Sequence, residues 1–297
     1  MNRSSINGVL FLLLLVFTGA SVFSFIGFIV SELILGIPLL SEPGLLSNLT
    51  DPELLPALRV MQVLQALGML IVPSLIYLWL TSTIVEVRFM FGMPVRQPVL
   101  ISIVFFMIAL PFVNYISQWN ASWEIPTFIG EWMKSKETQA GELTSMFLEM
   151  PTVGLLVFNL IMIALLPAVG EELIFRGIMQ RGIHRMTANP HLAIWVAAML
   201  FSAMHMQFLG FVPRLLMGVA MGYLFFWSGS LWYPMIAHFT NNAMAVVLAY
   251  GIQQGSVQPE IENAGIENGS LAAFSLFFCC MLLYVFKQHQ ASMQIQR

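Results

Sequence analysis

Long uncharged apolar runs constrain this chain more than any other feature. The first, Gly8–Val30, is about 23 residues long, enough for a helix to cross the roughly 30 Å hydrocarbon core of a bilayer. Only 9% of the 297 residues are charged, against about 25% in a soluble globular protein. The sequence therefore predicts an all-α, polytopic membrane helix bundle.

A secretory signal peptide is the competing interpretation of the first run, because Thr18-Gly19-Ala20 resembles a small-residue cleavage site. A signal core spans only about 7–15 apolar residues, whereas this run continues well past that point. We therefore expect a retained first helix. The chain as a whole, residues 1–297, is expected to form one integral membrane domain without a separate soluble part.

About eight transmembrane helices are expected, and the fourth to seventh of them, within residues 152–250, are the candidate catalytic helices. Arginines gather in the loops on one side, and the positive-inside rule places those loops in the cytoplasm. This gives a topology with both the N- and the C-terminus inside. The predicted spans are residues 8–30, 60–85, 98–117, 152 onward with an extension over 177–185, 191–209, 212–227, 231–250 and 270–286.

The segment Pro167-Ala-Val-Gly-Glu-Glu-Leu-Ile-Phe-Arg176 places three charges at the end of an apolar run. Each charged side chain within a membrane costs roughly 2.5–3.5 kcal/mol even on the gentler insertion scale. Glu172 and Arg176 are four residues apart on one helical face, which favours an ion pair. Glu171 is rotated by about 100° and is free to face something else. An alternative is an ordinary helix end at the membrane surface.

Two later spans also carry unexpected polar side chains. Phe201 and His205 lie four residues apart in the fifth predicted span, and His238 and Asn242 lie four apart in the seventh. A single histidine in a membrane is more often a packing or hydrogen-bonding residue than a catalytic one. Together with the acidic pair, however, these groups are expected to face the bundle interior or a water-filled cavity.

A carboxylate, two imidazoles and an amide suit the hydrolysis of an amide bond. Glu171 and His205 could hold a water between them, and the carboxylate would remove its proton. His238 and Asn242 could donate hydrogen bonds to the developing oxyanion. Glu172 would be held by Arg176 and would orient a neighbouring side chain without contacting the substrate. Other membrane-protease chemistries fit poorly, since the chain has no His-Glu-x-x-His motif, no Gly-x-Ser-x-Gly motif, and Asp51 as its one aspartate.

Glu-Glu-x-x-x-Arg, Phe-x-x-x-His and His-x-x-x-Asn, in this order on successive helices, resemble the CPBP family. This is the CAAX-protease and bacteriocin-processing group, also called the ABI family, which includes the eukaryotic endopeptidase that acts on prenylated CAAX proteins. The resemblance covers Glu171–Asn242. It implies that Glu171 and His205 activate the water, that His238 and Asn242 form the oxyanion hole, and that Glu172 and Arg176 support the first glutamate.

The resemblance leaves the cofactor open, because the family has been described both as metalloproteases and as metal-independent glutamate proteases. Glu171, His205 and His238 could together bind one zinc ion. We favour a metal-independent site without a cofactor, since a carboxylate with an amide-containing oxyanion hole accounts for every polar group.

The predicted function is an intramembrane endopeptidase in the cytoplasmic membrane of a bacterium, acting on a membrane-associated or lipidated protein. Its expected partners are membrane lipids and that substrate, and the net charge of −3 argues against nucleic acid. A non-proteolytic scaffold or bacteriocin-immunity protein is one alternative. A proton-coupled transporter is another, although such proteins often show inverted repeats and we find none in the sequence.

Overall fold

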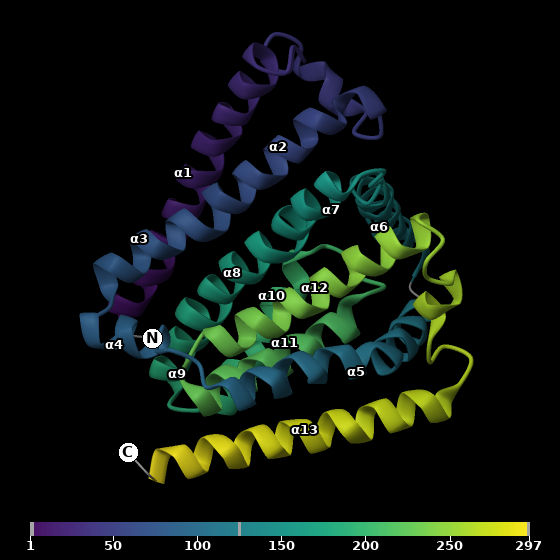
Figure 1. The fold of residues 1–297 in the computed structure, drawn as a ribbon. Helices are drawn as coiled ribbons and strands as arrows, with labels where there is room; N and C mark the ends of the chain where they lie inside the picture. Colours follow the sequence, from purple (N-terminus) through teal and green to yellow (C-terminus); the bar gives the residue numbers. More distant parts are fainter. Residues whose placement is uncertain (1–2, 124–125, 296–297) are drawn as a thin grey trace.

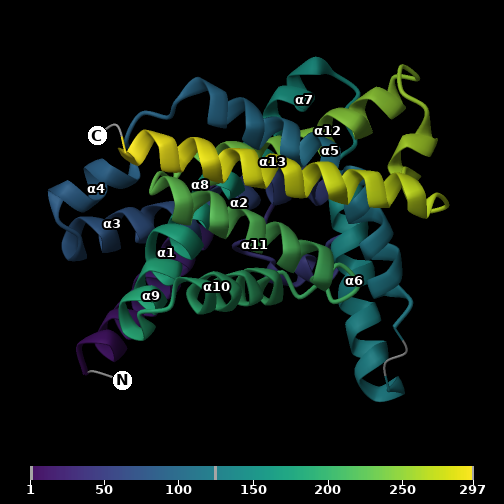
Figure 2. The same ribbon diagram turned by 90° about the horizontal axis from the view of Figure 1, so that it is seen from below.

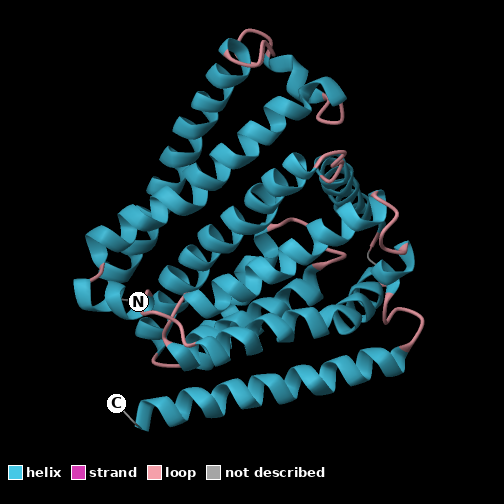
Figure 3. Cartoon of the chain, viewed as in Figure 1, coloured by secondary structure: helices cyan, strands magenta, loops and turns pink. Residues whose placement is uncertain are grey.

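The computed structural model describes residues 3–123 and 126–295, and every regular element among them is a helix (Figure 3). Within these described residues, seven helices are long and apolar enough to cross a membrane: Gly8–Leu33, Pro52–Thr81, Arg96–Ala121, Val153–Thr187, Phe211–Ser228, Trp232–Gln253 and Gly269–Met293. The fold class is thereby confirmed as a polytopic membrane helix bundle. The first of these lies within α1 (Arg3–Leu33), which continues without a break through Thr18-Gly19-Ala20.

The predicted fifth span, residues 191–209, is too long. The structure forms the shorter α10 (Pro190–Met204) there, so that seven long helices and one short apolar helix replace the eight comparable spans expected. Asn189 caps the N-terminus of α10 by accepting a hydrogen bond from the backbone of Leu192, 3.1 Å away. His205 is the C-terminal cap, and Met206 then adopts a φ of 54°, which ends the helical path. His205 therefore lies at a helix end and not within a helix.

Other predicted boundaries shift by a few residues. The second span ends at Thr81 and its polar continuation forms a separate short helix, α4 (Ile84–Met90). The third and eighth spans are longer than expected, as α5 (Arg96–Ala121) and α13 (Gly269–Ile295). The polar segment before the fourth span contains a further helix, α6 (Thr127–Phe147).

The fourth span is one continuous helical path of 35 residues, Val153–Thr187. It consists of α7 (Val153–Asn159), the π-helical η4 (Leu160–Leu165), α8 (Leu166–Glu172), the π-helical η5 (Leu173–Gln180) and α9 (Arg181–Thr187). Pro167 lies in the first turn of α8 and cannot donate a backbone hydrogen bond. The π-helical turns on either side of α8 are of a kind that is frequent at functional sites.

The helices run alternately back and forth, and α1 begins at the same end of the bundle at which α13 ends (Figure 1). α8 packs against α12 (Trp232–Gln253), and α13 lies along α5. α1 forms a hairpin with α2 (Leu55–Gln65) and α3 (Val72–Thr81), to one side of the other helices. α6 runs across the direction of the other helices (Figure 2).

Two glycines of α11 (Phe211–Ser228) allow it to pack closely against α10, as small residues do in membrane bundles. A Cβ at Gly218 would lie 3.1 Å from the Cβ of Ala198, and one at Gly222 would lie 2.8 Å from Cγ2 of Ile194. The four-residue spacing of these glycines puts both on the helix face that contacts α10.

Candidate active site

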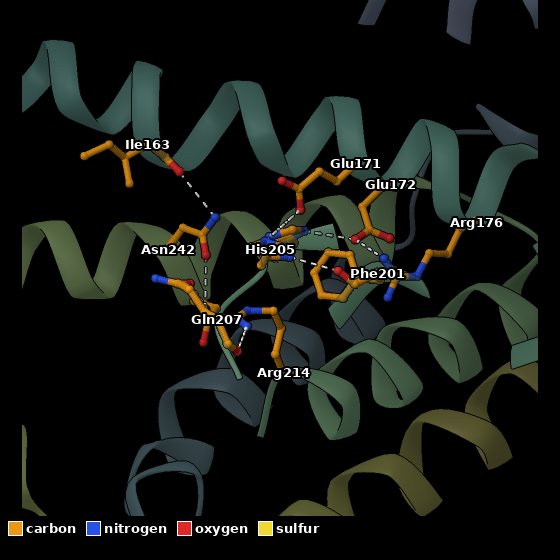
Figure 4. A network of polar contacts seen from close by, with 11 residues as sticks. Ile163, Glu171, Glu172, Arg176, Phe201, His205, Gln207, Arg214 and Asn242 are labelled. Carbon is orange, nitrogen blue, oxygen red and sulfur yellow. Dashed lines mark hydrogen bonds and ion pairs between the residues drawn. The ribbon is translucent and has the colours of Figure 1, made fainter. Parts of the chain in front are cut away.

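The side chains singled out in the sequence gather in one polar network between α8, the end of α10 and α12 (Figure 4). Glu171 and Glu172 are the last two residues of α8, and His238 and Asn242 lie one turn apart on α12. Glu171, Glu172 and His238 are buried, and the side chain of His205 is 28% exposed. His205 therefore marks the side from which the network is open.

Both imidazoles present the same nitrogen to Glu171. Nε2 of His238 lies 3.8 Å, and Nε2 of His205 4.0 Å, from Oε2 of Glu171. That carboxylate oxygen is buried and accepts no hydrogen bond from the described residues. Because a buried polar atom normally has a partner, and a bound water needs two to four of them, a water between Glu171 and His205 would satisfy it.

The other ring nitrogen of each histidine, Nδ1, has a hydrogen-bond partner of its own. Nδ1 of His205 lies 2.8 Å from the carbonyl oxygen of Phe201, so this nitrogen carries the proton and donates it. The remaining Nε2 then holds a lone pair that faces Glu171. Nδ1 of His238 lies 3.0 Å from Oε1 of Glu172 and can donate to that carboxylate. Each imidazole is thus fixed in orientation by a partner outside the reacting centre.

Glu172 links His238 to a fully buried cation. Nη1 of Arg176 donates to Oε1 of Glu172 at 2.7 Å, the same oxygen that faces His238. Nη2 of Arg176 donates to the carbonyl oxygen of Gly218 at 2.8 Å. This gives a second reason for a glycine at position 218, because a residue without a side chain leaves its carbonyl oxygen accessible to the guanidinium of Arg176.

The ring of Phe201 lies at the centre of these groups. It packs edge-on against His205 and His238, with ring centroids 5.1 and 5.7 Å apart. The guanidinium carbon of Arg176 lies 5.0 Å from the centre of the same ring. Phe201 therefore packs against both histidines and restricts the rotation of their rings.

Asn242 is held by two hydrogen bonds. Its Nδ2 donates to the carbonyl oxygen of Ile163, in the π-helical η4, at 3.3 Å, and its Oδ1 accepts from Nδ2 of Asn241 at 3.1 Å.

Glu171, His205 and His238 were the zinc ligands considered above, and the residues that the structure describes include no group of three or more such side chains placed to hold a metal ion. The two closest approaches, 3.8 and 4.0 Å, are between imidazole nitrogens and a single carboxylate oxygen. Fixing the second nitrogen of each histidine is nevertheless also what metal-bound histidines require.

Arg214 and Gln207 belong to the same network, although the sequence analysis did not single them out (Figure 4). Nη2 of Arg214 donates to Oε1 of Gln207 at 2.7 Å. A charged residue in the first turn of the predicted sixth span was the available signal. Two cavities among those of the described residues lie against α4, and neither Arg214 nor Gln207 lines them.

Comparisons with known proteins locate a family relationship in this part of the chain. Residues 153–244 match the family model described as type II CAAX prenyl endopeptidase Rce1-like. An uncharacterized protein of Bacillus subtilis (strain 168), YpbD, is 31% identical over 90 residues, which cover 29% of this chain and 43% of YpbD. The chain thus matches less than half the length of this relative. No solved structure gives a significant match.

The matched residues begin at the N-terminus of α7 and end on α12, just past Asn242. They contain all seven residues that the three sequence motifs contribute. Residues 153–244 of this integral, multi-pass membrane protein therefore resemble the Rce1-like family, which confirms the resemblance that the motifs predict.

Proposed function

We propose that this protein is an intramembrane endopeptidase that hydrolyses a peptide bond of a membrane-associated or lipidated protein. The observation that carries the proposal is the meeting of Nε2 of His205, Nε2 of His238 and an unbonded carboxylate oxygen of Glu171 within 4.0 Å. The match of residues 153–244 to a peptidase family supports the same reaction.

In the proposed reaction, a water donates one hydrogen bond to Oε2 of Glu171 and the other to Nε2 of His205. Both atoms can only accept in this state. The water oxygen attacks the carbonyl carbon of the scissile bond while Glu171 takes one of its protons. When the carbon–nitrogen bond breaks, that proton passes to the leaving amine, and the other product is a carboxylic acid. General base catalysis of this kind contributes typically 10²–10⁴-fold.

The oxyanion would be stabilised by His238 and Asn242. Because Nδ1 of His238 donates to Glu172, its Nε2 can donate to an oxyanion only when the ring is an imidazolium. Glu172 stabilises that cation directly, while Arg176 balances the charge of Glu172. Nδ2 of Asn242 would turn from Ile163 to the oxyanion, and each such donor is worth about 10²–10³ in rate.

We propose that this reaction needs no metal, because each polar group of the network already has a role in it. A zinc ion held by Glu171, His205 and His238 is the alternative. Removing divalent metals from the purified protein with a chelator is expected to leave activity unchanged. Loss of activity on chelation, with recovery on adding zinc alone, would instead establish a metalloenzyme.

The function is tested with purified protein in lipid nanodiscs and a pool of random peptides anchored by an N-terminal acyl chain. Cleavage products are identified by mass spectrometry. We expect Glu171→Gln and His205→Ala to lower cleavage by 10² or more without changing thermal unfolding. His191→Ala is the matched control, since His191 is exposed and bonds Tyr223 outside the site.

Cleavage by both variants at the rate of the unaltered protein would contradict the proposal. If the unaltered protein cleaves nothing while both variants keep its effect in cells, the protein acts as a scaffold or immunity factor. Proton-coupled uptake lost with Glu171→Gln would indicate a transporter. The bacterial relative supports a location in a bacterial cytoplasmic membrane, and we propose that location here.

A further inference from the structure

A cavity of about 380 Å³ lies where α4 meets the C-terminal end of α13, and Figure 2 shows both at the same end of the bundle. Its volume falls within the roughly 300–1,000 Å³ that is typical of small-molecule sites. Arg88 of α4, Gln290 of α13 and Tyr233 of α12 are among the residues that line it. No residue of the candidate active site is among the described residues that do so.

Two buried side chains of this cavity have hydrogen-bond donors to offer. Gln290 is 5% exposed, and its buried Nε2 has no hydrogen-bond partner among the described residues. The hydroxyl oxygen of Tyr233 accepts from the backbone N–H of Val95 at 2.9 Å, which leaves its O–H available as a donor. Because a buried polar atom normally has a partner, a ligand that accepts hydrogen bonds would complete this site.

Arg88 gives the cavity a positive charge that no neighbouring carboxylate balances. Among the described residues Arg88 forms no ion pair within 4.0 Å, and none of those that line the cavity is Asp or Glu. The other cavity against α4 differs, because Glu86 and Arg181 both line it and form an ion pair at 3.3 Å. The charge and the donors of the cavity at Arg88 therefore suit an anion.

The loop between α4 and α5, which forms part of the cavity wall, is fixed to the start of α12. The hydroxyl of Ser230 donates to the carbonyl oxygen of Gly92 at 3.2 Å. The backbone N–H of Leu231 donates to the carbonyl oxygen of Met90 at 2.8 Å. The wall is thus ordered before a ligand binds, which lowers the entropic cost of binding.

Apolar side chains at the cavity indicate which kind of anion it takes. Val85, Phe89 and Met93 line it and are 75%, 60% and 89% exposed. Nε1 of Trp232 donates to the carbonyl oxygen of Phe91 at 3.3 Å, and tryptophan is enriched at the membrane–water interface. An anion that carries an acyl chain could cover the apolar side chains, whereas a free anion would leave them in water.

We propose that this cavity binds the phosphate headgroup of an anionic phospholipid, with an acyl chain lying across Phe89 and Met93. The guanidinium of Arg88 would form charge-assisted hydrogen bonds with the phosphate oxygens, and Gln290 and Tyr233 would donate to them as well. Arg88 lies on the side that the positive-inside rule places in the cytoplasm, where basic pockets between membrane helices bind anionic headgroups. This inference is independent of the proposed peptidase function and uses none of its residues.

The experiment measures lipid binding to the purified full-length protein, delipidated in detergent, by native mass spectrometry. The probes are dioctanoyl phosphatidylglycerol, dioctanoyl phosphatidylcholine and inorganic phosphate. We expect phosphatidylglycerol to bind more tightly than either of the other two. Arg88→Gln is expected to weaken its binding about fivefold or more, because one cation near an anionic headgroup has an effect of this size.

Gln290→Leu tests the buried donor separately from the charge. Without lipid this variant should be as thermally stable as the unaltered protein or more so, because it removes a buried donor that has no acceptor. It should also reduce the increase in unfolding temperature that phosphatidylglycerol produces in the unaltered protein. A variant that is less stable without lipid but keeps the full increase would show that Gln290 is structural and would contradict its place in the site.

Arg96→Gln is the matched control, since Arg96 is an exposed arginine at the start of α5 that does not line the cavity. It should leave phosphatidylglycerol binding unchanged. Equal weakening by Arg88→Gln and Arg96→Gln would overturn the proposal and indicate a general attraction to a basic surface. Inorganic phosphate that displaces phosphatidylglycerol at equal concentration would overturn the lipid assignment and indicate a site for a free anion.

Discussion

Glu172 and Arg176 show, at the scale of single residues, how a buried ion pair can fix a neighbouring imidazole. Their side chains are 0% and 1% exposed, and the shared oxygen of Glu172 faces both Arg176 and His238. Taking two charges out of water is costly, so such a pair contributes little net stability, whereas removing one partner leaves the other charge uncompensated. We therefore interpret the pair as an orienting device for His238.

Arg176→Met is expected to destabilise the protein by about 3–5 kcal/mol, because it leaves the Glu172 carboxylate buried and unpaired. Thermal unfolding in detergent micelles measures this. Glu172→Gln/Arg176→Met should recover most of the loss, since neither charge remains and the Gln oxygen can still accept from His238. Arg185→Gln, which breaks a more exposed pair, should cost about 1 kcal/mol or less. A double variant as unstable as the single one would refute the charge-pairing explanation.

At the scale of elements, α4 shows how a short helix is held outside the membrane spans. Thr83 and Glu86 form a capping box, in which each side chain accepts from the other's backbone N–H, at 3.2 and 3.0 Å. Arg181 and Arg185 from α9 both contact the Glu86 carboxylate. The backbone hydrogen bond from Thr83, and then these two cations, hold the pKa of Glu86 below its ordinary value.

This pKa predicts how docking of α4 onto α9 depends on pH. A carboxylate whose pKa is depressed by folding adds stability that is complete above its ordinary pKa, and this stability is lost as pH falls through the lower, folded-state pKa. Protection of α4 against hydrogen exchange, corrected for the intrinsic exchange rate at each pH, should therefore be constant near neutral pH and decrease below about pH 4.5, the ordinary value. Glu86→Gln should increase exchange at neutral pH and remove the pH dependence. An unchanged acid response in Glu86→Gln would exclude Glu86 as its source.

At the scale of the whole molecule, the contact between α10 and α11 determines where His205 lies. Gly218 and Gly222 bring the two helices together, and their carbonyl oxygens accept hydrogen bonds from Arg176 and from Gln180, at 2.8 and 3.0 Å. The same two glycines thus join the fourth span to the sixth. Because α10 ends at Met204, this packing places His205 beside Glu171 instead of carrying it past the site.

Gly222→Ala is expected to separate α10 from α11, because the new Cβ would lie 2.8 Å from Cγ2 of Ile194 and 3.0 Å from Oε1 of Gln180. Overpacking of this kind costs about 1–3 kcal/mol, measured by thermal unfolding, and peptide cleavage should fall with it. Gly182→Ala, in α9 and with no atom within 4 Å of its Cβ, should be neutral or stabilising by roughly 0.5–1 kcal/mol. Equal effects of the two substitutions on thermal unfolding and peptide cleavage would show that the contact between α10 and α11 at Gly222 does not determine stability or activity.

Much of the fold and part of the candidate site could be predicted because their signals are local. Apolar runs predict membrane helices directly, and the four-residue spacing of Glu172 and Arg176 predicts the pair that the structure shows at 2.7 Å. The capping box of α4 was also present in the sequence as Thr83-Ile-Val-Glu86. Arg214 could not be found in this way, because its place in the network of Figure 4 depends on helices far apart in the sequence.

The sequence by itself determined that the chain is a membrane helix bundle, where most of its helices lie, and which polar residues are too costly to be in lipid without partners. The tertiary structure alone decided that α10 stops at Met204, that both histidines turn Nε2 toward Glu171, and that Asn242 donates to the carbonyl oxygen of Ile163. The physical reason is the range of the interactions. Hydropathy and helical spacing act within one helix, whereas ring orientation and hydrogen-bond partners depend on packing between helices.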